Sequence, residues 1–174
     1  MTHKLFDRAY RWFVDHKLPV IVSSSTQLSL YLQGDFFPND PEVDFCLLDE
    51  DVDNMLISLG IVNSTVTNKG IIHIDVGVDI PLARLIICDK YVVVNLVGGT
   101  FVVFPKEIIL PFIPLKYKDY TLWQCHDPER YFAFIYGPNW RQEAGKTWRH
   151  GTIYLQATSI QDAVHVYEHN RATH

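Results

Sequence analysis

Residues Val20–Asp53 read VIVSSSTQLSLYLQGDFFPNDPEVDFCLLDEDVD, and this stretch decides the fold that we expect. Its apolar start predicts a short buried strand over 19–23, which leads into a Ser-rich turn and a helix over 26–32. A second apolar run predicts another strand over 43–48, which the chain enters through a cluster of acids. A strand, a turn, a helix and a second strand in this order indicate an α/β domain.

Acidic residues crowd into this stretch, and no Lys or Arg stands between Leu18 and Asn68. The acids are Asp35, Asp40, Glu42, Asp44, Asp49, Glu50, Asp51 and Asp53. Repulsion among so many carboxylates is costly unless water solvates them or a cation neutralises them.

Glu42, Val43, Asp44 and Phe45 alternate carboxylate and apolar side chains. Because alternate residues of a strand share a face, Glu42 and Asp44 project together while Val43 and Phe45 enter the core. Two such carboxylates suit a hard cation, Mg²⁺ or Mn²⁺. The alternative is a solvated edge strand of alternating polarity.

Ser24, Ser25 and Thr26 open the predicted helix between the two strands. Their hydroxyls and the first backbone N–H groups of that helix can receive a phosphate. Serine and threonine are also ordinary helix caps, so capping stays open as the alternative.

Several motifs follow one another along the chain: SSTQLS at 24–29, PNDPEVD at 38–44, IHIDV at 72–76, FPKE with a later LP at 104–111, and YGPNW at 136–140. In this order they resemble the signature of the LicD-type phosphotransferases, the group that includes fukutin and fukutin-related protein. The resemblance covers most of the chain. It implies a nucleotidyltransferase-like fold, α/β or α+β, with a mixed β-sheet flanked by helices. We expect one such domain over residues 1–174.

The resemblance also implies the site. Glu42 and Asp44 would hold the metal, Mg²⁺ or Mn²⁺, with Asp40 as a ligand or close neighbour. Asp75 would be the third ligand or the catalytic base, with Asp79 in reserve, and Asp44 would share the catalytic work. The remaining residues expected at the phosphate or nucleotide are Ser24, Ser25, Thr26, Arg130 and Arg141.

The implied activity is a metal-dependent phosphotransfer. A phosphorylated small group, such as phosphocholine or ribitol phosphate, would move from a CDP-activated donor to a sugar hydroxyl of a glycan. One alternative is a nucleotidyltransferase that acts on a protein, an RNA or a small molecule. Another is a catalytically degenerate binding module, because serines stand where the family has two glycines, and Leu32 stands where it has a basic residue.

The composition limits the partners and the compartment. With 174 residues and a net charge of −5, we expect one globular domain that does not bind nucleic acid. No apolar run approaches the ~20 residues that span a bilayer. The first residues, MTHKLFDRAYRWF, carry charges throughout and lack an apolar signal region. The three cysteines are widely spaced, so a cytoplasmic location is expected.

The rest of the chain predicts further elements in the same way. Thr2 is expected to cap an amphipathic helix over 3–16. Helices are also expected over 49–59, 127–136 and 159–170, and strands over 61–67, 71–76, 84–88, 91–96, 100–104, 120–125 and 152–157. Asn68–Gly70 should form a hairpin turn, and 105–114 should be a proline-rich connection.

Overall fold

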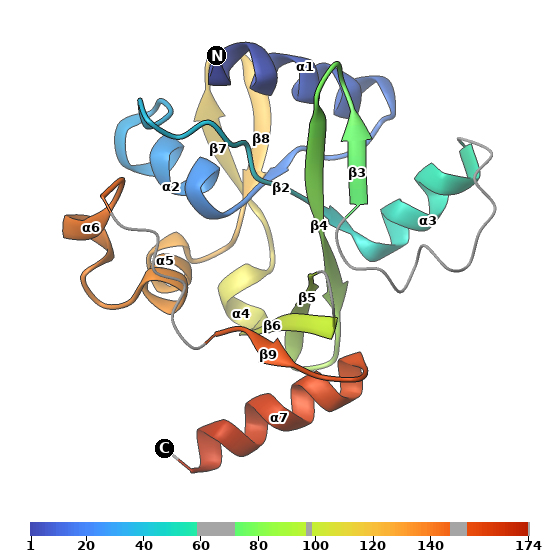
Figure 1. Ribbon diagram of the computed structural model, residues 1–174, viewed down its shortest axis with the longest axis vertical. Helices are drawn as coiled ribbons and strands as arrows, with labels where there is room; N and C mark the ends of the chain where they lie inside the picture. Colours follow the sequence, from blue (N-terminus) through green and yellow to red (C-terminus); the bar gives the residue numbers. More distant parts are fainter. Residues whose placement is uncertain (59–71, 97–98, 147–152, 174) are drawn as a thin grey trace.

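The structure is a computed structural model that describes residues 1–58, 72–96, 99–146 and 153–173. In these residues nine strands form one mixed sheet flanked by helices (Figure 1), which confirms the predicted α/β class. The strands are β1 Ile21–Val22, β2 Phe45–Leu48, β3 Ile72–Asp75, β4 Asp79–Ile87, β5 Tyr91–Asn95, β6 Thr100–Pro105, β7 Ile113–Tyr117, β8 Tyr120–Gln124 and β9 Leu155–Gln156. The helices are α1 Thr2–Asp15, α2 Ser24–Gln33, α3 Asp49–Ser58, α4 Lys106–Ile109, α5 Pro128–Tyr136, α6 Trp140–Glu143 and α7 Ile160–Ala172. None of these helices is long and apolar enough to cross a membrane.

The strand order places β1 and β2 near the middle of the sheet. The order is β7-β8-β1-β2-β4-β5-β6-β9, with β3 paired to β4 beside this path. The pairs β1–β8 and β2–β4 are parallel, and the other pairs are antiparallel. β3 pairs with the first half of β4 and β5 with its second half. The predicted strand–helix–strand unit is therefore the centre of the molecule.

Side-chain alternation on the central strands divides the core between the two faces of the sheet. Val22 and Phe45 pack with Phe6 and Phe13 of α1 on one face. Their neighbours Ile21 and Cys46 pack with α4 and α5 on the other face. Successive residues of a strand point to opposite faces, so each short strand contributes to both clusters.

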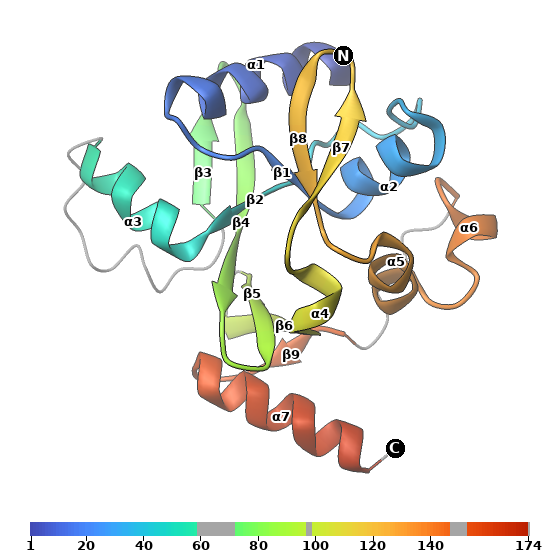
Figure 2. The ribbon, with the colours of Figure 1, turned by 180° about the vertical axis from the view of Figure 1, so that it is seen from behind.

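The last helix covers a third cluster at the far end of the sheet. Ala163 of α7 is fully buried against Val93 and Phe101. Ser159 caps α7, because its hydroxyl accepts a hydrogen bond from the backbone N–H of Asp162 at 3.0 Å. Figures 1 and 2 show α1 and α7 at opposite ends of the molecule, with the chain termini beside them.

Three expectations from the sequence need comment. The connection expected over 105–114 contains α4 and the start of β7. The sequence did not predict these elements because prolines usually interrupt helices and strands. Pro114 is tolerated there because β7 is an edge strand of the sheet. Thr2 does not cap α1: the cap position is Met1, and the hydroxyl of Thr2 donates to the carbonyl of Asp40 at 2.9 Å instead. The hairpin turn expected at Asn68–Gly70 lies outside the described residues.

Candidate functional site

The start of α2 meets Asp44 because β1 and β2 run antiparallel. The register pairs Val22 with Phe45, so the residues that follow β1 lie beside those that precede β2. The backbone N–H and the hydroxyl of Ser25 both donate to Oδ2 of Asp44, at 3.2 and 2.7 Å. In return, the backbone N–H of Asp44 donates to the hydroxyl of Thr26 at 2.8 Å. The first turn of α2 therefore holds the Asp44 carboxyl in one orientation.

Ser24, the first residue of α2, has an unusual backbone conformation. Its φ angle is +46°, in the left-handed region that costs an L-residue other than glycine roughly 1–2 kcal/mol. Its N–H donates to the hydroxyl of Tyr131 at 3.2 Å. The family that the motifs resemble has glycine at the position of Ser24. A positive φ angle is a physical reason for glycine at such a position, because glycine adopts it without steric cost.

Ser24, Ser25 and Asp44 line a cavity of about 450 Å³, which we call the acidic cavity. Its lining consists of Ser24, Ser25, Asn39, Asp40, Pro41, Glu42, Asp44, Tyr136 and Tyr154. Three carboxylates, two serines and two tyrosines thus surround one space. The volume of this cavity lies in the range of small-molecule sites, and its lining is mainly polar.

The pKa of the Asp44 carboxyl is abnormal, mainly because this side chain is buried. Burial raises the pKa of Asp44 to about 6, and the hydrogen bond from Ser25 opposes that rise. The nearby negative charges of Glu42 and Asp40 raise the pKa further. An ionised Asp44 is therefore costly here, and a bound cation would offset that cost.

The acidic cavity offers carboxylate oxygens, the type of ligand that Mg²⁺ prefers. In proteins, Mg²⁺ keeps several waters and is held by one or two carboxylates together with substrate phosphates. Glu42 is exposed, and Asp44 uses only Oδ2 in the hydrogen bonds to Ser25. Within the described residues, no group of three or more His, Cys, Asp or Glu side chains is placed to hold a metal ion.

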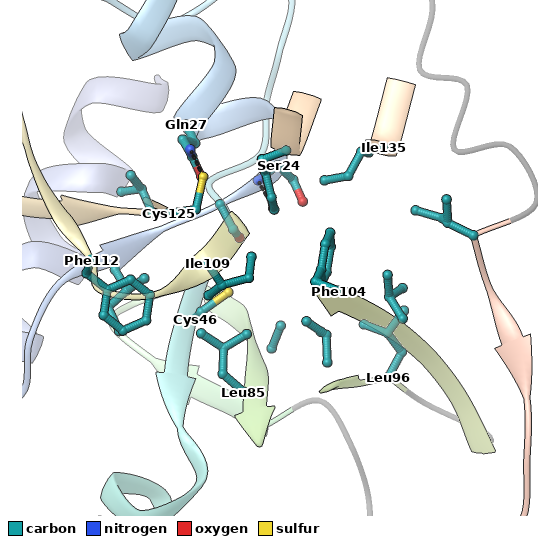
Figure 3. Close-up of a pocket in the computed structure, with 18 of the residues that line it drawn as sticks. Ser24, Gln27, Cys46, Leu85, Leu96, Phe104, Ile109, Phe112, Cys125 and Ile135 are labelled. Atoms are coloured by element: carbon teal, nitrogen blue, oxygen red, sulfur yellow. Dashed lines mark hydrogen bonds between the residues drawn. The ribbon is translucent and has the colours of Figure 1, made fainter. Parts of the chain in front are cut away.

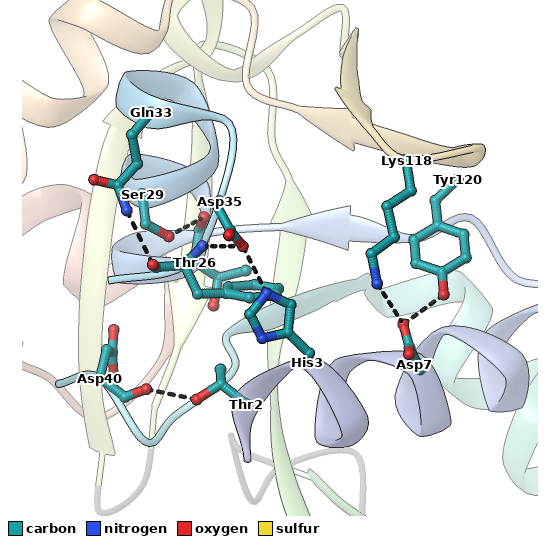
Figure 4. Close-up of polar contacts among 11 residues, drawn as sticks. Thr2, His3, Asp7, Thr26, Ser29, Gln33, Asp35, Asp40, Lys118 and Tyr120 are labelled. Atoms are coloured by element: carbon teal, nitrogen blue, oxygen red, sulfur yellow. Dashed lines mark hydrogen bonds and ion pairs between the residues drawn. The ribbon is translucent and has the colours of Figure 1, made fainter. Parts of the chain in front are cut away.

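The segment that carries the acids is tied to the N-terminus of α1. Figure 4 shows the contact of Thr2 with Asp40 and that of His3 with Asp35, whose side-chain atoms are 2.7 Å apart. Within the same segment, Oδ1 of Asp40 accepts a hydrogen bond from the N–H of Glu42 at 3.1 Å. α1 therefore positions the backbone beside the acidic cavity.

Asp75 and Asp79 do not line the acidic cavity. They face each other across the turn between β3 and β4 and are exposed. Oδ1 of Asp75 accepts from the N–H of Gly77 at 2.8 Å, and Asp79 lies 2.9 Å from Nδ1 of His73. The structure thus does not bring the expected third carboxylate to Glu42 and Asp44.

Arg130 and Arg141 also lie outside the lining of the acidic cavity. Both are exposed and paired with acids: Arg130 with Glu107 at 3.6 Å, and Arg141 with Glu129. The guanidinium of Arg141 also stacks on the Trp140 ring, 4.4 Å from its centre. The phosphate contact expected of these two arginines stays a prediction.

Tyr136, Tyr154 and Asn39 line the acidic cavity without having been predicted to do so. Burial raises the pKa of both phenols, and the charge of Asp44 adds to this rise. Both hydroxyls are therefore protonated donors at neutral pH. Tyr136 belongs to the YGPNW motif and Tyr154 to an expected strand, but neither position in the sequence indicates which way the ring points.

Comparison with models of known protein families and with curated protein sequences finds no match. The resemblance to LicD-type phosphotransferases therefore rests on the sequence motifs alone.

Proposed function

We propose that this chain is a metal-dependent phosphotransferase whose acidic cavity binds a divalent cation together with the phosphates of an activated donor. The observation that carries the proposal is the meeting of Glu42 and Asp44 with the first turn of α2 in one cavity. Carboxylates can hold the cation, and the Ser24 hydroxyl and the two lining phenols can donate hydrogen bonds to the phosphate.

Each side chain has a role in this proposal. Glu42 and Asp44 would hold Mg²⁺ or Mn²⁺, and Ser25 fixes the orientation of Asp44. A cation held there would supply positive charge beside the donor's pyrophosphate. The hydroxyl of Ser24 and the phenols of Tyr136 and Tyr154 offer hydrogen bonds to phosphate oxygens. Hydrogen bonds and metal contacts of this kind orient the phosphate for attack.

The proton of the acceptor needs a base inside the acidic cavity. Asp75 lies outside this cavity and cannot be that base. In the proposal the base is therefore Asp40, the third carboxylate of the lining. The donor that the motifs imply is a CDP-linked alcohol, and the acceptor is a sugar hydroxyl of a glycan.

A second candidate is a module that binds the same ligand without chemistry. One hydrogen bond favours this candidate: the backbone N–H of Ser25 donates to Asp44. This N–H group is therefore already engaged and does not bind a phosphate. The strained Ser24 in place of glycine also limits close approach of a phosphate to the backbone.

Calorimetry of CDP binding, with and without Mn²⁺, tests the proposal. We expect cation-dependent binding by the wild type and its loss in the Glu42→Gln/Asp44→Asn double variant, whose amides keep the shape of the carboxyls. Absence of binding by the folded wild-type protein would refute the proposed site.

A transfer assay with a CDP-linked alcohol and a sugar acceptor, run beside a second assay that contains CTP, then separates the candidates. Release of CMP supports the phosphotransferase, whereas release of pyrophosphate from CTP indicates a nucleotidyltransferase. Cation-dependent CDP binding with no release of either product indicates the binding module.

A further inference from the structure

A second cavity, which we call the apolar cavity, lies between the sheet and the helices α4 and α5. Its volume is about 100 Å³. Ala83, Leu85 and Val94 contribute to its sheet side, and Ile109 and Ile135 to its helix side. Figure 3 shows Leu85, Ile109 and Ile135 around one space.

The two cavities share part of their walls. Ser24 and Tyr154 line both the acidic cavity and the apolar cavity. Ser24 is the first residue of α2, and Tyr154 is 42% exposed. The two cavities therefore adjoin at Ser24 and Tyr154.

The chemistry of the apolar cavity suits an uncharged group. Its two thiols, Cys46 and Cys125, stay protonated because burial raises the pKa of each to about 12. Its buried amide, that of Gln27, already donates to the sulfur of Cys125 at 2.9 Å and to Gln124 at 3.4 Å. No full charge and no unused amide donor of these residues therefore faces the space.

The size of the apolar cavity limits the group that it can take. An engineered apolar cavity of about 150 Å³ stays dry and binds benzene. A space of about 100 Å³ accordingly suits a branch or chain of roughly four carbons. Filling it restores van der Waals contacts that an empty cavity lacks.

We propose that the apolar cavity binds the apolar part of the ligand whose phosphate occupies the acidic cavity, so that the protein prefers phosphate esters of alcohols with a short hydrocarbon chain. This inference rests on the proposed function, because the acidic cavity must first bind the phosphate. It differs from the motif-based expectation, which names polar alcohols such as choline and ribitol.

The test is a phosphorus NMR titration of methyl, butyl, hexyl and octyl phosphate in the presence of Mg²⁺, with inorganic pyrophosphate as the reference for the acidic cavity. We expect affinity to rise about threefold to fourfold for each added methylene, and to level off once the chain exceeds the space. In Ala83→Leu the rise should disappear, because the larger side chain fills the apolar cavity, while pyrophosphate binds as it does to the wild type.

Ala133→Leu is the matched control, since Ala133 is exposed on α5 and does not line either cavity. Val94→Phe fills the same space from the next strand and serves if Ala83→Leu melts early. Each variant is used only after its thermal unfolding shows a folded protein.

Equal affinities for methyl and hexyl phosphate, with pyrophosphate still bound, would overturn this inference and leave the proposed function standing. A chain-length effect that persists in both filled variants would also overturn it. If neither pyrophosphate nor methyl phosphate binds with the cation, the proposed function itself fails, and this inference fails with it.

Discussion

Two pairs of acids lie near strand ends in this protein, and the surroundings of the two pairs differ. Glu42 and Asp44 line a cavity at the start of α2, where Asp44 accepts two hydrogen bonds from Ser25. Asp75 and Asp79 are exposed on the β3–β4 turn, where a backbone N–H and His73 contact them. Acids flanked by apolar residues occur in both places. Only the pair beside a helix start and within a cavity has the surroundings of a binding site.

The largest difference between the two pairs should appear in cation-dependent binding. Glu42→Gln/Asp44→Asn should weaken CDP binding in Mn²⁺ by about a hundredfold or more, since each charge-assisted contact contributes roughly 1.5–3 kcal/mol. Asp75→Asn/Asp79→Asn should bind CDP as the wild type does. Calorimetry of both double variants checks this, and a loss of equal size in the second variant would return Asp75 to the site.

The next effect concerns stability and pH. Folding raises the pKa of Asp44 to about 6, from about 3.9 in an unfolded chain. Between these values the folded protein retains a proton that the unfolded chain has released. Stability therefore falls as the pH rises from about 4 to about 6.

Asp44→Asn should remove this loss and stabilise the protein at pH 7 by up to about 3 kcal/mol, measured in chelator by urea unfolding. Asp75→Asn is the exposed control and should change stability by less than about 0.5 kcal/mol. A variant Asp44→Asn with unchanged stability at every pH would contradict the burial of this carboxyl.

A smaller effect tests the hydrogen bond that distinguishes the two pairs. Ser25→Ala removes the hydroxyl that donates to Asp44 and should destabilise the protein by about 1–2 kcal/mol at pH 7. His73→Ala removes the partner of Asp79 on the exposed turn and should cost about 0.5 kcal/mol or less. Chemical denaturation of both variants gives the comparison, and equal costs would argue against a special environment for Asp44.

The smallest effect concerns the backbone at Ser24. Ser24→Gly relieves the positive φ angle, but glycine loses more conformational entropy on folding. The net result should be a stabilisation of about 0.5 kcal/mol, read from the thermal midpoint. The same change at Ser29, inside α2, should instead destabilise the protein by about 1 kcal/mol. If Ser24→Gly destabilises as much as Ser29→Gly, the turn does not require a left-handed residue.

Local patterns in the sequence predicted much of the fold. The helix start at Asp127 and Pro128 is confirmed, because the Asp127 side chain accepts from the N–H of Arg130. Such caps involve residues within one turn, so the sequence contains the whole interaction. β7 was missed because Pro114 indicates a break, and only the sheet order shows that the strand lies at an edge.

Part of the candidate site was likewise predictable from the sequence, and part was not. By itself, the sequence determined the strand–turn–helix–strand unit that carries Ser24–Thr26 and Asp44, because their separation along the chain is short and the hydrophobic pattern is regular. Only the tertiary structure decided that Tyr136 and Tyr154 line the same cavity as Asp44 and that Asp75 does not. These relations depend on how distant segments pack against one sheet, and no local pattern of residues specifies that packing.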